Sequence, residues 1–206
     1  MTSKSRDRLL QAGAQEFARH GLRGTRVRDV VERAGVNERM LYEHFGSKEG
    51  LYRAVLEEQS ADIGAAWTPM LERAATLGPQ EGLRGALRAF FDLVSDRPLL
   101  AALLAHEGLS EETLRTPVGV DQVPVPLRGL FKRGQEEGVF RTDSDFALFY
   151  TAAMVLLTAL SGPPARFADL VGERPTPRDR EQLRDQLVDL LLDGLTGPGG
   201  QKDQHD

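Results

Sequence analysis

Apolar residues recur at helical spacing along almost the whole chain. In residues 5–20, for example, Leu10, Gly13, Ala14 and Phe17 follow the spacing i, i+3, i+4, i+7 and so share one side of a helix. The alternation of apolar and polar residues that is typical of a strand between two turns is absent. The pattern therefore predicts an all-α fold.

Glycines divide the first part of this pattern into separate helices. Gly21 should end the first helix, and Gly35 should separate a helix over residues 27–34 from another over residues 37–45. Ser47 then has the side chain and the position of an N-cap for a longer helix.

The pattern continues through the second half of the chain. Pro69 predicts a kink or break near Trp67 in the helix that follows Ser47. Thr142 and Asp145 have the spacing of a capping box, and Gly194 should end the last helix. Further helices are expected over residues 79–95, 97–107 and 126–137, then to about residue 161, and from residues 176–179 to about 192, with a loop over 115–126.

The chain has 206 residues, which is enough for one large domain or two small ones. We expect a three-helix N-terminal domain over residues 1–46 and a larger helical domain over residues 47–195. The tail over residues 196–206 is rich in glycine and polar residues, and we expect it to be disordered.

The amino-acid composition excludes several kinds of site and segment. The chain has no cysteine, which excludes disulfides and thiolate metal sites. No apolar run approaches the roughly 18 residues that span a membrane. The N-terminal residues lack an apolar segment followed by a cleavage site, so we expect no signal peptide and a cytoplasmic protein.

The net charge of −5 conceals an uneven distribution. Residues 1–53 hold eleven Lys and Arg against seven Asp and Glu, whereas the rest of the chain holds fifteen against twenty-four. A basic N-terminal segment on an acidic body indicates that this segment meets a polyanion.

Two short helices joined by Ala34-Gly35-Val36 are typical of a helix-turn-helix. Leu41 and Phe45 would bury the back of the second helix, and its polar side chains would then project outward and fit the major groove of DNA. The candidate DNA-binding residues are Thr25, Arg26, Arg28, Asn37, Glu38, Arg39, Tyr42, His44 and Lys48.

The side chains suggest different contacts. Arg39 could donate two parallel hydrogen bonds to guanine, and Glu38 could accept one from a cytosine amine. Tyr42 and His44 are placed for phosphates, as is Lys48 at the start of the next helix. Tyr42 could instead belong to the core and Lys48 to a solvated cap. Glu43 fits a solvated or intramolecular partner better than a phosphate contact.

Residues 6–56 resemble the DNA-binding head of the tetracycline-repressor-like (TetR) family. The matching elements are Phe17, Ala18 and Gly21, then Thr25, Val27, Arg28 and Asp29, then Ala34-Gly35-Val36, Leu41-Tyr42, His44-Phe45 and Ser47-Lys48-Glu49. Two departures stand out. Arg26 occupies the place where the family usually has a Ser or Thr cap, and Asn37-Glu38-Arg39-Met40 puts charge where the family often has small residues.

The resemblance implies a body that binds a small molecule and dimerises through its last two helices. Residues 146–160 are apolar on nearly every side of the predicted helix, so a single neighbouring helix face cannot bury all of this apolar surface. The alternative is an unusually buried monomer core. The candidate interface residues are Phe146, Phe149, Leu156, Leu160, Leu183, Leu187 and Leu191.

A ligand site in the body would be lined by the larger or more polar side chains of its central helices, which favours an apolar or aromatic effector. His106 is the best polar candidate, although a core or surface histidine explains it equally well. The candidates are Trp67, Met70, Phe90, Phe91, His106, Phe131, Tyr150 and Met154.

The sequence contains no constellation typical of an enzyme, and its four histidines lack metal-ligand spacing, so we expect no catalysis, metal or cofactor. We predict a ligand-responsive transcriptional regulator, most simply a repressor, that binds a palindromic operator as a homodimer. Its partners would be double-stranded DNA, a small-molecule effector and a second copy of the chain. The alternative is a helical adaptor that does not bind DNA.

Overall fold

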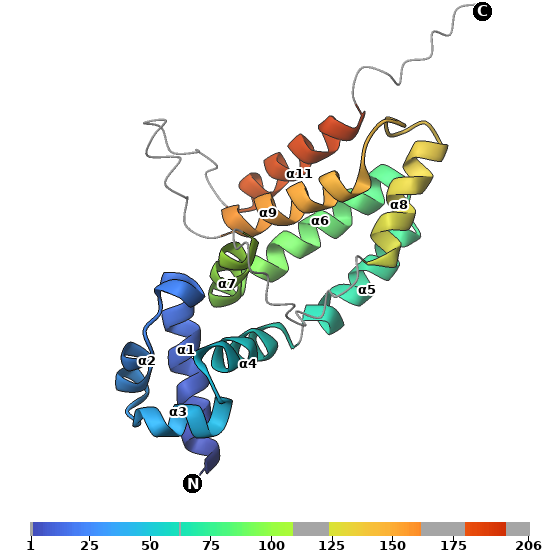
Figure 1. Ribbon diagram of the computed structural model, residues 1–206. Coiled ribbons are helices and arrows are strands. Elements are labelled where there is room, and N and C mark those ends of the chain that lie inside the picture. Colours follow the sequence, from blue (N-terminus) through green and yellow to red (C-terminus); the bar gives the residue numbers. More distant parts are fainter. Residues whose placement is uncertain (1, 62, 109–123, 162–179, 197–206) are drawn as a thin grey trace, which may run out of the picture. The chain divides into compact units, whose positions relative to one another are not determined.

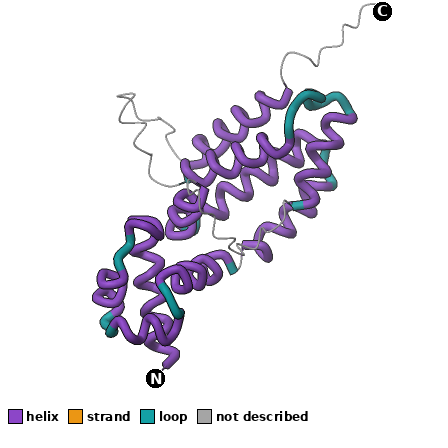
Figure 2. Tube along the Cα trace, viewed as in Figure 1, coloured by secondary structure: helices purple, strands orange, loops and turns teal. Residues whose placement is uncertain are grey.

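The computed structural model describes residues 2–61, 63–108, 124–161 and 180–196. Every regular element in this part of the chain is a helix, as Figure 2 shows, and the all-α prediction is confirmed. Contacts divide the chain into two compact units. The first unit contains Met1–Ile63 and Arg97–Asp121, and the second contains Gly64–Asp96 and Gln122–Asp206.

The first unit is built around α1 (Figure 1). Its helices are α1 (Thr2–Gly24), α2 (Val27–Ala34), α3 (Glu38–Phe45), α4 (Lys48–Ser60) and α7 (Pro98–Gly108). Leu9, Phe17, Leu41 and Leu56 are fully buried in one apolar core, to which α7 contributes Leu103. Burying such side chains supplies the main driving force for folding this unit.

The helix α1 continues to Gly24, but its backbone breaks at Gly21, as the sequence predicted. Gly21 has φ 65° and ψ 177°, a left-handed conformation that only glycine adopts without strain. Leu22 then packs against the core of the first unit.

Helices α4 and α7 pack against α1, whereas the sequence pattern predicted both to belong to the larger domain that begins at residue 47. A side chain at Gly13 would meet Val55 and Leu51 at 3.2–3.3 Å, so a glycine lets α4 approach α1 closely. The rings of Phe17 and Tyr52 meet edge to face with centroids 4.9 Å apart. These contacts make α4 part of the first unit, called the head below, although α4 lies beyond residue 46 in the chain.

The second unit contains most of α5 (Ile63–Ala75), with α6 (Pro79–Ser95), α8 (Val125–Glu136), α9 (Phe146–Leu160) and α11 (Arg180–Thr196). The expected break near Trp67 is wrong, because α4 ends at Ser60 and α5 runs through Pro69. Pro69 is exposed, and so is Ala65, whose carbonyl oxygen loses the hydrogen bond that a proline nitrogen cannot donate. Water can satisfy that oxygen, so the helix continues.

Ion pairs join α6 to α11 along their length. Arg84 pairs with Asp189, and Arg88 Nε lies 3.0 Å from Asp185 Oδ1. Further along, the charges are exchanged: Asp92 accepts from Arg184 at 2.8 Å, and Asp96 accepts from Arg180 at 2.8 Å. Because each helix carries both signs in a fixed order, this antiparallel register brings these opposite charges together.

An aromatic cluster joins α8 to α9. The ring of Phe131 lies 5.2 Å from that of Phe146 and 5.5 Å from that of Phe149. Asp145 is the N-cap of α9, since its Oδ1 accepts from the Leu148 nitrogen at 2.7 Å. The capping-box assignment of Asp145 is therefore wrong by one turn, because Asp145 itself begins the helix.

Gly194 does not end the last helix, which continues to Thr196. The buried side chain of Leu195 and a hydrogen bond from the Arg141 nitrogen to the Leu195 carbonyl hold the final turn. The predicted start of this helix at residues 176–179, the loop over 115–123 and the tail from residue 197 lie outside the described residues. None of the described helices combines the length and apolar character that crossing a bilayer requires.

Candidate nucleic-acid interface

The turn between α2 and α3 has the geometry that the sequence predicted. Gly35 has φ 61°, and its nitrogen donates to carbonyl oxygens in the last turn of α2. The Val36 nitrogen donates to the Val31 oxygen at 3.1 Å, which completes a Schellman ending. This ending directs the chain from α2 into α3 and pairs the backbone nitrogens of Gly35 and Val36.

The helix α3 begins and packs as expected. Asn37 is its N-cap, and Asn37 Oδ1 accepts from the Met40 nitrogen at 3.0 Å. Leu41 is fully buried in the core of the first unit, and Val36 and Phe45 pack against that core. With its back buried, α3 has one face left for other contacts.

The opposite face of α3 consists of four exposed side chains, Glu38, Arg39, Tyr42 and Glu43, and is called the polar face below. Two interactions, each one helical turn long, link them in pairs. Arg39 Nε donates to Glu43 Oε1 at 2.7 Å, and the Tyr42 hydroxyl donates to Glu38 Oε1 at 3.3 Å. The surface is therefore dense in hydrogen-bonding groups, two of which are carboxylates.

Tyr42 belongs to this surface, because 46% of it is exposed. Desolvation of its hydroxyl, followed by the hydrogen bond to Glu38, raises the pKa of Tyr42 above its ordinary value. The hydroxyl proton is held in the hydrogen bond to Glu38, and the phenol oxygen can still accept a hydrogen bond from another donor.

Thr25 is the exception among the candidate DNA contacts. It is buried, and its hydroxyl donates to the Gly21 carbonyl at 2.7 Å and to the Glu16 carbonyl at 3.2 Å. The structure therefore gives this side chain the task of joining the end of α1 to the start of α2. The prediction that the Thr25 side chain contacts DNA is corrected accordingly.

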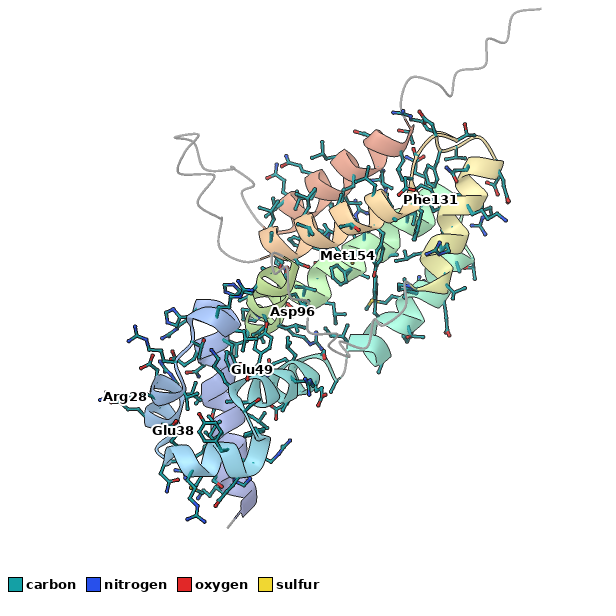
Figure 3. All side chains as sticks on the ribbon, viewed as in Figure 1. Arg28, Glu38, Glu49, Asp96, Phe131 and Met154 are labelled. Atoms are coloured by element: carbon teal, nitrogen blue, oxygen red, sulfur yellow. The ribbon has the colours of Figure 1, made fainter. Side chains whose placement is uncertain are left out.

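Lys48 links the start of α4 to the start of α2. Its Nζ donates to the Thr25 carbonyl at 3.1 Å, and the side chain is partly buried. An ammonium group has three donors, so two remain for other partners. Arg26 and Arg28 lie nearby in sequence at the start of α2 and are exposed. Figure 3 labels Arg28 on α2 and Glu38 at the start of α3.

His44 is held by α1. Its Nε2 lies 2.9 Å from Ser5 Oγ, and the guanidinium of Arg6 lies 5.5 Å from the centre of the Phe45 ring. The N-terminal turn of α1 thus lies beside the end of α3. Sequence reasoning missed Ser5 and Arg6, because a contact across 39 residues leaves no local pattern.

Sequence reasoning also missed the ion pair that positions α2. Glu16 is buried, and its Oε1 accepts from Arg33 Nε at 2.7 Å and lies 2.6 Å from Arg33 Nη2. Two nitrogens of the guanidinium thus contact one carboxylate oxygen, and the pair joins α1 to α2, so it sets the orientation of the helix that precedes the turn.

The ligand-site candidates do not form one group. Seven of them lie in the second unit, whereas His106 lies in the first, where its Nε2 is 3.3 Å from the Ala18 carbonyl. This placement corrects its assignment to the body. Trp67 and Phe90 meet with ring centroids 5.0 Å apart, and the Trp67 nitrogen donates to the Ala86 carbonyl.

The remaining candidates differ in burial. Phe91 and Phe131 are buried, and Tyr150 and Met154 are partly buried, whereas Met70 is exposed. Figure 3 labels Phe131 and Met154 in the second unit. Burial raises the pKa of Tyr150. In the described ranges, no group of three His, Asp or Glu side chains is placed to hold a metal ion.

The proposed interface residues are more buried than the sequence suggested. Phe149 and Leu187 lie inside the second unit, and the other five are partly buried. The large aliphatic side chains that are exposed on the described part of these helices are Leu148 and Val155 on α9, at 71% and 43%, and Leu190 on α11, at 66%. Because α9 is apolar all round, its sequence pattern could not indicate which side remains open.

Comparison with known proteins agrees with this geometry. Residues 9–55 match the model of the bacterial regulatory proteins of the tetR family, and residues 79–191 match that of the tetracyclin repressor-like C-terminal domain. The HTH-type transcriptional repressor NicS of Pseudomonas putida is 33% identical over 68% of this chain and 68% of its own length. The HTH-type transcriptional repressor KstR2 of Mycolicibacterium smegmatis is 28% identical over 96% of this chain and 93% of its own.

A solved structure supports the same assignment across both units. The TetR family transcriptional regulator PfmR from Thermus thermophilus is 29% identical, with a TM-score of 0.61, over 92% of this chain and 96% of that one. The relatives are transcriptional regulators rather than enzymes. This chain belongs to the TetR family of DNA-binding transcriptional regulators.

Proposed function

We propose that the chain is a homodimeric repressor that binds a two-fold symmetric operator, with α3 of each subunit in a major groove. The observation that carries this proposal is the division of α3 between a buried back at Leu41 and an exposed polar face of four side chains. A helix supported in this way can enter the groove, with its N-terminal residues nearest the base edges. The relatives NicS and KstR2 are named as repressors.

In vitro selection of bound DNA by the purified protein tests the proposal. A two-fold symmetric consensus is expected, because each half-site would be bound by one subunit. Binding to the consensus should weaken steeply as salt rises, since phosphate contacts release counterions. An adaptor without DNA binding would select no consensus.

Arg39→Ala should relax the base preference at one pair of each half-site and cost about 1–3 kcal/mol of specific binding. Arg39 is 86% exposed, so its truncation should leave the fold intact. The measurement is a series of operator variants with one base pair changed at a time. An equal loss on every variant would identify Arg39 as a phosphate contact instead.

Lys48→Ala should weaken binding to all sequences alike and flatten the dependence of affinity on salt by about one unit. The physical reason is the loss of one cation that would contact a phosphate. Salt titrations on operator and random duplex measure both quantities. If Lys48 served only to hold Thr25, the thermal stability would fall and the salt slope would stay the same.

The dimer would form through α9 and α11, which contact each other in the second unit. Leu148, Val155 and Leu190 support this assignment, because large aliphatic side chains that remain exposed on neighbouring helices indicate an interaction surface. Two helices from each subunit would make a four-helix interface.

An apolar or aromatic effector bound by the second unit would release the operator. The buried aromatic side chains of that unit, such as Trp67, Phe90 and Phe131, support this effector class. The response would reach the head through α4 and α7, since the chain enters or leaves the second unit beside both of them. Operator titrations with and without a bound effector test this step. We propose that this regulator acts in the cytoplasm and catalyses no reaction.

A further inference from the structure

The contact between Arg39 and Glu43 leaves one side of the guanidinium free. Arg39 Nε donates to Glu43 Oε1 at 2.7 Å. The two terminal nitrogens, Nη1 and Nη2, have no partner in the part of the chain that the structure describes. A guanidinium is planar and its donors point in fixed directions, so a partner on Nε determines where the Nη groups point.

Guanine presents two acceptors, O6 and N7, side by side in the major groove. An arginine donates to both through two neighbouring N–H groups. Because Glu43 occupies Nε, the Nη1–Nη2 edge is the one that Arg39 can present to this pair of acceptors. The carboxylate therefore selects the orientation in which Arg39 meets the base.

Stability does not explain this pair. The side chains of Arg39 and Glu43 are 86% and 55% exposed, and an exposed ion pair of this kind contributes little to folding. Its effect on binding is different, because a long arginine side chain loses rotamer freedom when it contacts a base. A partner that restricts the side chain beforehand reduces that loss.

Glu43 also carries a charge that DNA repels. The polar face of α3 holds the carboxylates of Glu38 and Glu43 against the single guanidinium of Arg39. Repulsion from phosphates opposes binding at every sequence, whereas the orientation of Arg39 favours only sequences with a guanine in reach. The orientation of Arg39 increases the difference between operator and random DNA, whereas the repulsion lowers the affinity for both alike.

We infer that Glu43 is a positioning residue for sequence-specific DNA binding, which presents Nη1 and Nη2 of Arg39 to a guanine of the operator. This inference rests on the proposed function, in which α3 enters the major groove. Glu43 would then contribute to sequence specificity through Arg39, without contacting a base itself.

Glu43→Gln tests the inference in the full-length protein. Three DNA probes are compared at one salt concentration: the selected operator, a changed operator and a random duplex. In the changed operator, the base pair at which Arg39→Ala loses its preference is replaced in both half-sites. Glu43→Gln should lower the preference for operator over the changed operator about tenfold, within the range expected for a bidentate arginine. Affinity for the random duplex should rise, because one negative charge is lost.

Two controls separate positioning from a general charge effect. Glu57→Gln removes one exposed carboxylate from α4, outside the polar face, and should leave the preference at that base pair unchanged. In an Arg39→Ala background, Glu43→Gln should no longer affect this preference, since the group on which it acts is gone.

An unchanged preference in Glu43→Gln, or the same loss of preference with and without Arg39, would overturn the inference and leave the proposed function intact. Equal affinity of the unmodified protein for its selected DNA and for random duplex would overturn the proposed function together with the inference.

Discussion

Gly50→Ala should strongly weaken operator binding and leave the second unit folded. Gly50 lies in the first turn of α4, and a Cβ at this position would overlap the backbone carbonyl oxygen of Phe45 at the end of α3. Since neither group is a flexible side chain, the two helices must move apart. Overpacking of this kind costs about 3 kcal/mol or more.

The displacement would separate the elements proposed to contact DNA. Ser47 Oγ accepts from the Gly50 nitrogen at 3.0 Å, and Lys48 Nζ donates to the Thr25 carbonyl from the same turn. Both contacts depend on the present position of α4. We expect operator affinity to fall at least about a hundredfold, because misplacing α3 and Lys48 affects base and phosphate contacts together.

Hydrogen exchange and fluorescence measure the two units separately. Amides of α3 and α4 should exchange faster in Gly50→Ala. Trp67 is the only tryptophan of the chain and is buried in the second unit, so its emission should stay the same.

Gly85→Ala is the matched control. Gly85 is an exposed glycine inside α6, and a Cβ at this position would meet nothing within 4 Å. It should be neutral or stabilising by about 0.5–1 kcal/mol. Wild-type affinity and exchange in Gly50→Ala would contradict the prediction.

Leu148→Glu combined with Leu190→Glu should convert the proposed dimer into a monomer. A two-fold interface would bury both leucines of each subunit. Four leucines at about 1.5 kcal/mol each correspond to about 6 kcal/mol, or roughly ten thousandfold in the dissociation constant of the dimer. The carboxylates would add a desolvation cost.

Sedimentation equilibrium measures the dimer, and titration with operator DNA measures the consequence. Operator affinity should fall with dimerisation, because a monomer can occupy only one half-site. Val125→Glu provides the control, since Val125 is 77% exposed in the second unit but lies at the start of α8. If the double variant remained a dimer, the interface would lie on another surface.

The head could be predicted from sequence in more detail than the body. The turn at Gly35, the cap at Asn37 and the buried position of Leu41 all follow from residues within one or two helical turns of each other. In contrast, the contacts of Glu16 with Arg33 and of Ser5 with His44 join residues 17 and 39 positions apart. No local pattern contains them, because in the sequence either partner alone looks like an ordinary polar residue of a helix.

Helix ends also divide into those set by local residues and those set by distant contacts. Gly21 and Gly35 interrupt the helix where the sequence placed them, because each adopts a left-handed backbone conformation. Pro69 and Gly194 do not interrupt their helices. At Gly194 the packing of Leu195 outweighs the roughly 1 kcal/mol that a glycine costs in a helix.

The sequence by itself determined the helical fold, the helix-turn-helix and the polar face of α3, because hydrophobic period, caps and glycines act over a few residues. Only the tertiary structure decided that α4 and α7 pack on the head and that Thr25 faces inward. It also decided which leucines of α9 and α11 stay exposed. The physical reason is that burial depends on contacts between distant segments, which an apolar residue makes with whichever surface the fold brings to it.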